Sequence, residues 1–161
     1  MRSNSRKAME IGWREYVSLP EFHLDKIKAK IDSGARTSAL HAEDITVTKE
    51  DGVEFVSFLV PVDGCPKGIR CKVKVTDKRP IKNTSGVPEE RYIVETILIL
   101  GDESWPIEVS LTNRLSMRFP LIIGRAAIRD KHFLLNPGGS YLAGRHIVFS
   151  APKITRLKKS T

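Results

Sequence analysis

Long apolar runs and cysteines are scarce in this sequence. Two cysteines in 161 residues are too few for a disulfide-dense secreted scaffold. The longest apolar segments, residues 97–100 and 119–123, have the length of strands, whereas a membrane-spanning helix needs about 18 or more apolar residues. The basic N-terminus is followed by no apolar stretch, so no secretory signal is predicted. We therefore expect a cytoplasmic globular chain that has no membrane partner.

Motifs for nucleotide and metal chemistry are missing as well. The sequence contains no GxxxxGK(S/T) phosphate loop, no GxGxxG and no HExxH. Its four histidines do not pair with the cysteines at the spacing of metal ligands, so we predict no metal site and no cofactor. Cys65 and Cys71 could face each other across a hairpin and form a disulfide. Two reduced thiols are the favoured alternative in a cytosolic chain.

The formal net charge of +8 is concentrated at the two ends of the chain. Residues 1–7 contain three basic residues and residues 151–161 contain four, with no acid in either segment, which leaves 20 basic and 19 acidic residues between them. We therefore predict a basic tail over residues 1–10, one domain over 11–150 and a second basic tail over 151–161. A nucleic-acid-binding domain needs positive charge on its folded surface, so nucleic acid is not expected as its partner. The tails could bind polyanions weakly.

Strand-length patterns fill most of the body. Residues 26–31 alternate strictly between apolar and lysine side chains, which is typical of a strand buried on one face. Further strands are predicted over residues 11–19, 37–47, 53–62, 69–76, 91–100, 105–111, 119–123, 132–136 and 141–149. Turns separate them at residues 63–68, 101–104 and 137–140, and only residues 125–131 predict a helix. This pattern favours an all-β barrel or sandwich in one domain with one short helix after Gly124.

The segment Asp32-Ser33-Gly34-Ala35 follows the alternating strand directly. On its own it is a common turn sequence, because Asp and Ser bond nearby backbone and Gly permits a positive φ. A second segment, residues 119–128, reads FPLIIGRAAI, in which a buried strand ends in glycine and passes into the predicted helix.

Together the two segments resemble the retropepsin-like aspartic proteases. In that family Asp-(Thr/Ser)-Gly-(Ala/Ser) follows an apolar strand, and a later apolar-apolar-Gly segment closes beneath it. The stretches AKIDSGARTSALHA, RPIKNTSGVPEERY, IEVSLTNR, FPLIIGRAAI and NPGGSYLAGR make the chain similar, over nearly all of residues 11–146, to a bacterial family labelled ATP-dependent zinc proteases. That family is linked with RimK-type ATP-grasp glutamate ligases. The resemblance implies a retropepsin-like (acid protease) closed barrel and peptide hydrolysis.

The resemblance also implies roles for individual residues. Asp32 would supply the catalytic carboxylate, the Ser33 hydroxyl would brace the paired active-site loops, and Gly34 would allow their close approach. Because the sequence has one Asp-Ser-Gly motif, the second carboxylate would come from an identical subunit of a homodimer. Ile123 and Gly124 would close beneath the loop. The residues expected at the substrate are Ala35, Arg36, Arg125 and Gly86, the last near the tip of a flap over residues 79–91.

The sequence departs from the viral members of the family at one position after the motif. Arg36 stands where those enzymes often have an acid that pairs with the arginine after the later glycine. Arg36 and Arg125 are therefore expected to repel each other unless an acid such as Asp130 or Glu43 lies between them.

Basic residues also flank the motif. Lys28, Lys30 and Arg36 cluster around Asp32 in the sequence, which suggests a basic rim that favours acidic or glutamate-modified peptides. The alternative is a solvated strand face whose lysines only point outward.

We therefore predict an aspartic endopeptidase that acts as a homodimer on peptide or protein substrates, with a functional link to an ATP-grasp glutamate ligase. One alternative is a non-catalytic peptide-binding or adaptor module on the same fold. The other is a zinc-dependent peptidase that uses His41.

Overall fold

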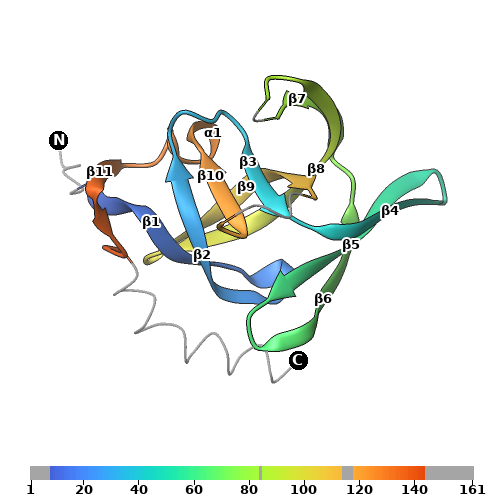
Figure 1. Ribbon diagram of the computed structural model, residues 1–161, viewed down its shortest axis with the longest axis horizontal. Helices are drawn as coiled ribbons and strands as arrows, with labels where there is room; N and C mark the ends of the chain where they lie inside the picture. Colours follow the sequence, from blue (N-terminus) through green and yellow to red (C-terminus); the bar gives the residue numbers. More distant parts are fainter. Residues whose placement is uncertain (1–7, 84, 114–117, 144–161) are drawn as a thin grey trace.

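The computed structural model describes residues 8–83, 85–113 and 118–143 of the chain (Figure 1). Its strands are β1 (Met9–Leu19), β2 (Leu24–Asp32), β3 (Ser38–His41), β4 (Glu43–Glu50), β5 (Val53–Val62), β6 (Cys65–Lys74), β7 (Asp77–Lys82), β8 (Pro88–Leu100), β9 (Glu103–Thr112), β10 (Leu121–Gly124) and β11 (Phe133–Ser140). A 3-10 helix, η1 (Pro20–Phe22), follows β1, and the short helix α1 (Arg125–Ile128) follows β10. The predicted all-β architecture with one short helix after Gly124 is confirmed.

Six of these strands close into a barrel. They are hydrogen-bonded in the order β1, β2, β10, β3, β9, β8, and the pairing of Ser18 with Ile99 returns β8 to β1. Strand β11 adds to the outer edge of β1, and β7 adds to β8. Closure leaves no free edge within the ring itself, so the predicted closed barrel is confirmed.

Strand β2 has the predicted two-residue period. Its apolar residues Ile27, Ala29 and Ile31 are at most 8% exposed, whereas Lys28 and Lys30 between them are exposed. The inward-facing residues join one apolar core, because alternate side chains of a strand point to opposite faces.

A separate three-stranded sheet, β4-β5-β6, packs on the same core. The rings of Phe22 and Phe58 meet edge to face at 5.4 Å and join this sheet to the barrel. The hairpin predicted around residues 63–68 is present, but β6 already begins at Cys65. Cys65 and Cys71 therefore lie on one strand and do not face each other, and both are free thiols. Burial raises the pKa of the Cys71 thiol to about 11.

The prediction for residues 132–143 is wrong in part. Residues 137–140, predicted as a turn, belong to β11, which pairs parallel to β1. The two backbones approach so closely that a Cβ on Gly12 would lie 2.3 Å from the carbonyl oxygen of Gly139. Residues 141–143 are not in a strand, and the remainder of the predicted strand 141–149 lies outside the described residues, as does the tail 151–161.

A buried carboxylate ties the segment after β11 to β1. Glu15 is fully buried, and its oxygens accept hydrogen bonds from the backbone N–H groups of Gly12 at 2.6 Å, Leu142 at 2.9 Å and Ala143 at 3.1 Å. Three donors satisfy a charge that would otherwise be costly to bury. No helix among the described residues is long and apolar enough to cross a bilayer.

Candidate active site

Asp32 lies where the ends of two neighbouring strands meet. It is the last residue of β2, and its register partner across the parallel pairing is Gly124, the last residue of β10. Strand β10 lies between β2 and β3, so the chain that joins β2 to β3 must cross the end of β10 (Figure 1). The two segments singled out in the sequence are thus brought together by strand pairing.

The turn that follows Asp32 is tight and open to solvent. The N–H of Gly34 donates to Asp32 Oδ1 at 3.0 Å, and the N–H of Ala35 donates to the Asp32 carbonyl oxygen at 3.1 Å. Asp32 is half-buried, while Ser33 and Gly34 are exposed. Within the described ranges, no donor occupies Asp32 Oδ2, which leaves this oxygen available to water or to a second carboxylate.

Gly124 lies against the backbone of the same loop. A Cβ on Gly124 would lie 2.7 Å from the carbonyl oxygen of Arg36 and 2.7 Å from the carbonyl carbon of Thr37. The next two N–H groups, of Arg125 and Ala126, donate to the carbonyl oxygens of Ala35 at 2.8 Å and Arg36 at 3.1 Å. The start of α1 is thereby attached to the loop, and Ile123, fully buried, anchors β10 in the core.

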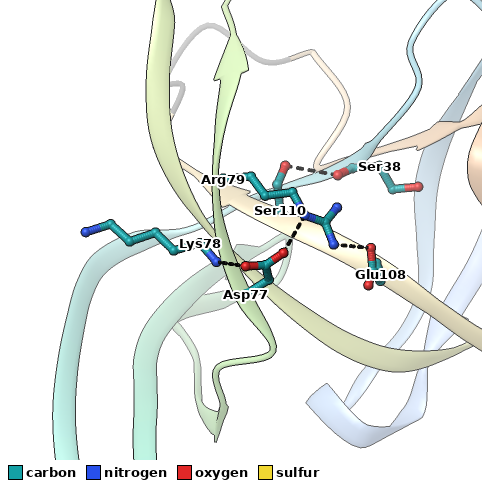
Figure 2. Close-up of polar contacts among 6 residues, drawn as sticks. All are labelled: Ser38, Asp77, Lys78, Arg79, Glu108 and Ser110. Carbon is teal, nitrogen blue, oxygen red and sulfur yellow. Dashed lines mark hydrogen bonds and ion pairs between the residues drawn. The ribbon is translucent and has the colours of Figure 1, made fainter.

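Ser38 is a site residue that the sequence analysis missed. Its side chain is 1% exposed, and its hydroxyl oxygen accepts the N–H of Gly124 at 3.0 Å. Its carbonyl oxygen accepts the Ser110 hydroxyl at 3.0 Å (Figure 2). A serine at the start of the strand sequence Ser-Ala-Leu was the available signal, because a polar side chain buried in a core requires a partner.

Arg125 has hydrogen-bond partners in the loop itself. Arg125 Nη1 donates to the carbonyl oxygens of Ser33 at 3.4 Å and Gly34 at 3.3 Å, so backbone dipoles of the loop receive its charge. Glu43, one of the acids expected between the arginines, lies instead 3.2 Å from His41 Nε2.

The basic cluster predicted around Asp32 is divided between two surfaces. Arg36 lines a cleft beside the loop. Lys28 and Lys30 lie on the outer face of β2, since the alternate residues Ala29 and Ile31 are buried in the core. Both lysines are exposed on that face.

The cleft has a volume of about 940 Å³ and lies between β7, β9, the α1 segment and residues 36–38. Its floor is formed in part by Trp105 and Ile107, and Trp105 Nε1 donates to the Ala127 carbonyl oxygen at 2.8 Å. The ionisable residues that line it are Arg36, Arg79, Lys82, Arg129, Lys131, Glu95, Glu108 and Asp130. Basic side chains thus outnumber acidic ones.

The predicted flap segment is a hairpin of β7 and the start of β8. Gly86 lies at its exposed tip with φ +80°, where Asn83 Oδ1 accepts the N–H groups of Ser85 and Val87 at 2.9 and 3.0 Å. Residues 79–82 of β7 line the cleft, and Gly86 lies beyond them.

Arg79 connects β7, the first strand of this hairpin, to β9 of the barrel. Its guanidinium donates to Asp77 Oδ2 at 2.7 Å and to Glu108 Oε1 at 2.9 Å (Figure 2). The hydrogen bond from Arg79, helped by the N–H of Lys78, lowers the pKa of Asp77 below its ordinary value. The contact joins one wall of the cleft to another, because Arg79 and Glu108 both line it.

A zinc site has no obvious ligand set in the described part of the chain. No three His, Cys, Asp or Glu side chains gather there in a way that could hold a metal ion. His41, the residue considered for that role, is paired with Glu43.

Comparisons with known proteins agree with this geometry. Residues 10–146 match the family model described as RimB-like, a retropepsin-like aspartic endopeptidase. Proteins named probable alpha-L-glutamate ligase from Shewanella pealeana and Parasynechococcus marenigrum are 41% and 42% identical over 136 residues, which is 83% of this chain. The chain spans only 30% and 29% of the length of those relatives.

A solved structure has the same fold. The crystal structure of a protein of unknown function from Legionella pneumophila is similar to this chain with a TM-score of 0.71 and 29% identity. The similarity covers 88% of this chain and 99% of the other.

Proposed function

This chain belongs to the RimB-like family of retropepsin-like aspartic endopeptidases, and on that premise we propose that it hydrolyses peptide bonds. The water that attacks the peptide is held between the Asp32 carboxylates of two identical subunits. The observation that carries the proposal is the position of Asp32 at an exposed turn, with one carboxylate oxygen held by the N–H of Gly34 and the other without a donor in the described chain.

The need for two subunits follows from the chemistry. Aspartic peptide hydrolysis uses one carboxylate as a base and one carboxylic acid as a donor, and this chain supplies one Asp-Ser-Gly turn. The exposure of Ser33 and Gly34 supports a close approach of two such turns. The absence of a side chain on Gly34 also leaves room around the carboxylate, because a Cβ there would lie 3.2 Å from Asp32 Oδ1.

The proposed reaction transfers protons in two stages. The ionised Asp32 takes a proton from the water as the water oxygen attacks the peptide carbonyl carbon, and the protonated Asp32 of the other subunit donates to the carbonyl oxygen. The protonated Asp32 then gives its proton to the peptide nitrogen while the ionised Asp32 takes one from a hydroxyl of the tetrahedral intermediate. The C–N bond breaks, and one carboxylic acid and one amine leave. The pair of carboxylates therefore holds one proton before and after the reaction.

The hydrogen bonds that hold the loop after Asp32 also serve catalysis. The hydrogen bonds of Gly124 to Ser38 and of Arg125 to Ala35 tie the loop to β10. A dyad works only when both carboxylates are held at hydrogen-bonding distance from one water, and misplacement by about 1 Å can cost about a hundredfold in rate.

The charge of the cleft suggests acidic peptides as substrates. Arg79 is paired with Asp77 and Glu108, and Lys131 lies 3.3 Å from Glu103. Arg36, Lys82 and Arg129 have no ion-pair partner among the described residues. These cations are available to the carboxylates of a bound peptide, such as those of its glutamate side chains.

A second candidate function is a non-catalytic peptide-binding module. It is favoured by the relatives named probable alpha-L-glutamate ligase, of whose length this chain matches about 30%. In that account the domain would present an acidic peptide to a ligase, and Asp32 would have no partner.

The test compares the full chain with Asp32→Asn, and uses Asp63→Asn in the exposed β5–β6 turn as the matched control. Cleavage of peptides rich in glutamate, and of the same peptides with glutamine, is followed by mass spectrometry. We expect Asp32→Asn to abolish cleavage with unchanged thermal unfolding, Asp63→Asn to cleave like the wild type, and glutamate peptides to be preferred. Cleavage that persists in Asp32→Asn would refute the proposed mechanism, and equal cleavage of both peptides would refute the acidic preference.

A further inference from the structure

Cations are gathered on the outer face of β1 and β2. Arg14 and Tyr16 of β1 lie in register with Lys30 and Lys28 of β2, and these four side chains point outward because the alternate residues are buried. Lys26 follows on the same strand and is exposed. We call the surface formed by Arg14, Tyr16, Lys26, Lys28 and Lys30 the β1–β2 face.

Aromatic rings hold two of these cations in place. The Arg14 guanidinium carbon lies 4.8 Å from the centroid of the Trp13 ring and 5.1 Å from that of Tyr141. Tyr141 stacks on Tyr16 with centroids 4.5 Å apart, and Lys26 Nζ lies 5.8 Å from the Tyr16 centroid. The result is a ladder in the order Trp13, Arg14, Tyr141, Tyr16 and Lys26, in which rings contact both cations.

The positive charge of this face is not neutralised within the described residues. No carboxylate there forms an ion pair with Arg14, Lys26, Lys28 or Lys30. Three of the four acids of the same two strands have other partners, and Asp32, the fourth, accepts the N–H of Gly34 through Oδ1 at the end of β2. Glu10 accepts from Asn136, Asp25 accepts from Ser18, and Glu15 is buried against backbone N–H groups.

The backbone of the face has no free hydrogen-bonding edge. Strand β1 is paired with β11 and β2, and β2 is paired with β1 and β10. An extended peptide therefore has no strand edge to join here, which is the usual source of affinity when a peptide adds to a sheet. A ligand of this face must be recognised through its charge.

More positive charge is connected to the face by the chain itself. Tyr141, the ring stacked on Tyr16, lies two residues before the last described residue, Ala143. Residues 144–161 contain five basic residues and no acid, and residues 1–7, before β1, contain three basic residues and no acid. A folded surface that gathers cations is typical of proteins that bind nucleic acid, and the sequence adds basic residues on either side of the domain.

We propose that the β1–β2 face binds the phosphate backbone of single-stranded nucleic acid. Phosphodiesters carry a charge at each nucleotide, and their binding gains free energy from released counterions without any need for backbone hydrogen bonds. The rings of the ladder already pack on one another or against a cation, so bases have little ring surface to stack on. Binding is therefore independent of base sequence.

Neutralising the face tests the proposal. Binding of a short fluorescein-labelled oligouridylate is followed by anisotropy between about 50 and about 200 mM salt. The face variant is Lys28→Gln with Lys30→Gln. The matched control, Lys49→Gln with Lys74→Gln, removes the same charge from exposed positions of the β4-β5-β6 sheet. A third variant, the tail variant, replaces Lys153, Arg156, Lys158 and Lys159 by Gln. All variants are made in the full chain.

We expect the face variant to weaken binding about fivefold and to reduce the salt slope by about 1.4, at about 0.7 for each phosphate contact. The control should bind within about twofold of the wild type, and oligoadenylate should bind like oligouridylate. Thermal unfolding of each variant verifies its fold.

Three results would overturn the proposal. First, the face variant could bind as tightly as the control variant. Loss of binding in the tail variant alone is one form of this result. Oligouridylate and oligoadenylate could differ strongly in affinity, which would indicate base readout. A labelled oligoglutamate could bind more tightly than the oligonucleotides and lose its binding in the face variant, which would make the face an acidic-peptide site.

Discussion

Replacing Gly124 by alanine should destabilise the protein through one steric conflict. The residue has φ −85° and ψ 167°, a conformation that alanine adopts freely, so no backbone strain is involved. The new Cβ would lie 2.7 Å from the Arg36 carbonyl oxygen and 2.8 Å from the Arg36 carbonyl carbon. These are backbone atoms of the loop that carries Asp32, and they cannot rotate away. Overpacking of this kind costs about 1–3 kcal/mol, and we expect the upper part of that range.

The assay is thermal unfolding by circular dichroism, with Gly138→Ala as the matched control. A Cβ at Gly138 would make only an ordinary 3.5 Å contact with Asn136 Oδ1, so its melting temperature should stay near that of the wild type. Gly124→Ala should melt about 4–12 °C lower, at about 2–4 °C for each kcal/mol in a chain of this size. Equal melting temperatures for Gly124→Ala and Gly138→Ala would contradict the close packing of β10 beneath the loop.

Two further predictions concern charged groups away from Asp32. Glu15→Ala leaves three N–H donors without an acceptor, those of Gly12 and Ala143 buried and that of Leu142 part-buried. It should lower the free energy of unfolding by about 3–5 kcal/mol, measured by denaturant titration, with Glu15→Gln intermediate; a loss below about 1 kcal/mol would refute the stabilising role of these hydrogen bonds. The pKa of Asp77 is lowered mainly by Arg79, so its contribution to stability is present above the ordinary aspartate pKa of about 3.9 and is lost as the pH falls through the lowered value. The melting temperature of Asp77→Asn should therefore lie below that of the wild type near neutral pH and converge with it in acid, whereas a constant difference would exclude this ion pair as the cause.

Local patterns were sufficient to predict the strands around the site. The alternation of lysine and apolar residues placed β2 correctly, and the apolar run before Gly124 indicated a strand buried on both faces. Both signals arise from burial, which is visible in consecutive residues. The resemblance to a known family then connected the two segments, which are about ninety residues apart in the chain.

Features that depend on contacts between distant backbones were not visible in the sequence. Residues 137–140 have the composition of a turn, yet they form part of β11, where the absence of a side chain on Gly12 lets the backbone at Gly139 approach. In the sequence Ser38 looks like an ordinary strand residue. Its role is visible only in the fold, where its hydroxyl accepts the N–H of Gly124.

The most direct test of the account is a subunit-mixing experiment. Wild-type chain and Asp32→Asn are mixed in equal amounts under conditions that exchange subunits, and peptidase activity is measured at constant total protein. If the dyad is shared across a two-fold axis, only dimers of two wild-type chains are active, and activity falls to about one quarter of that of the wild type. A fall to only about one half would show that each chain acts alone, and would contradict the shared dyad.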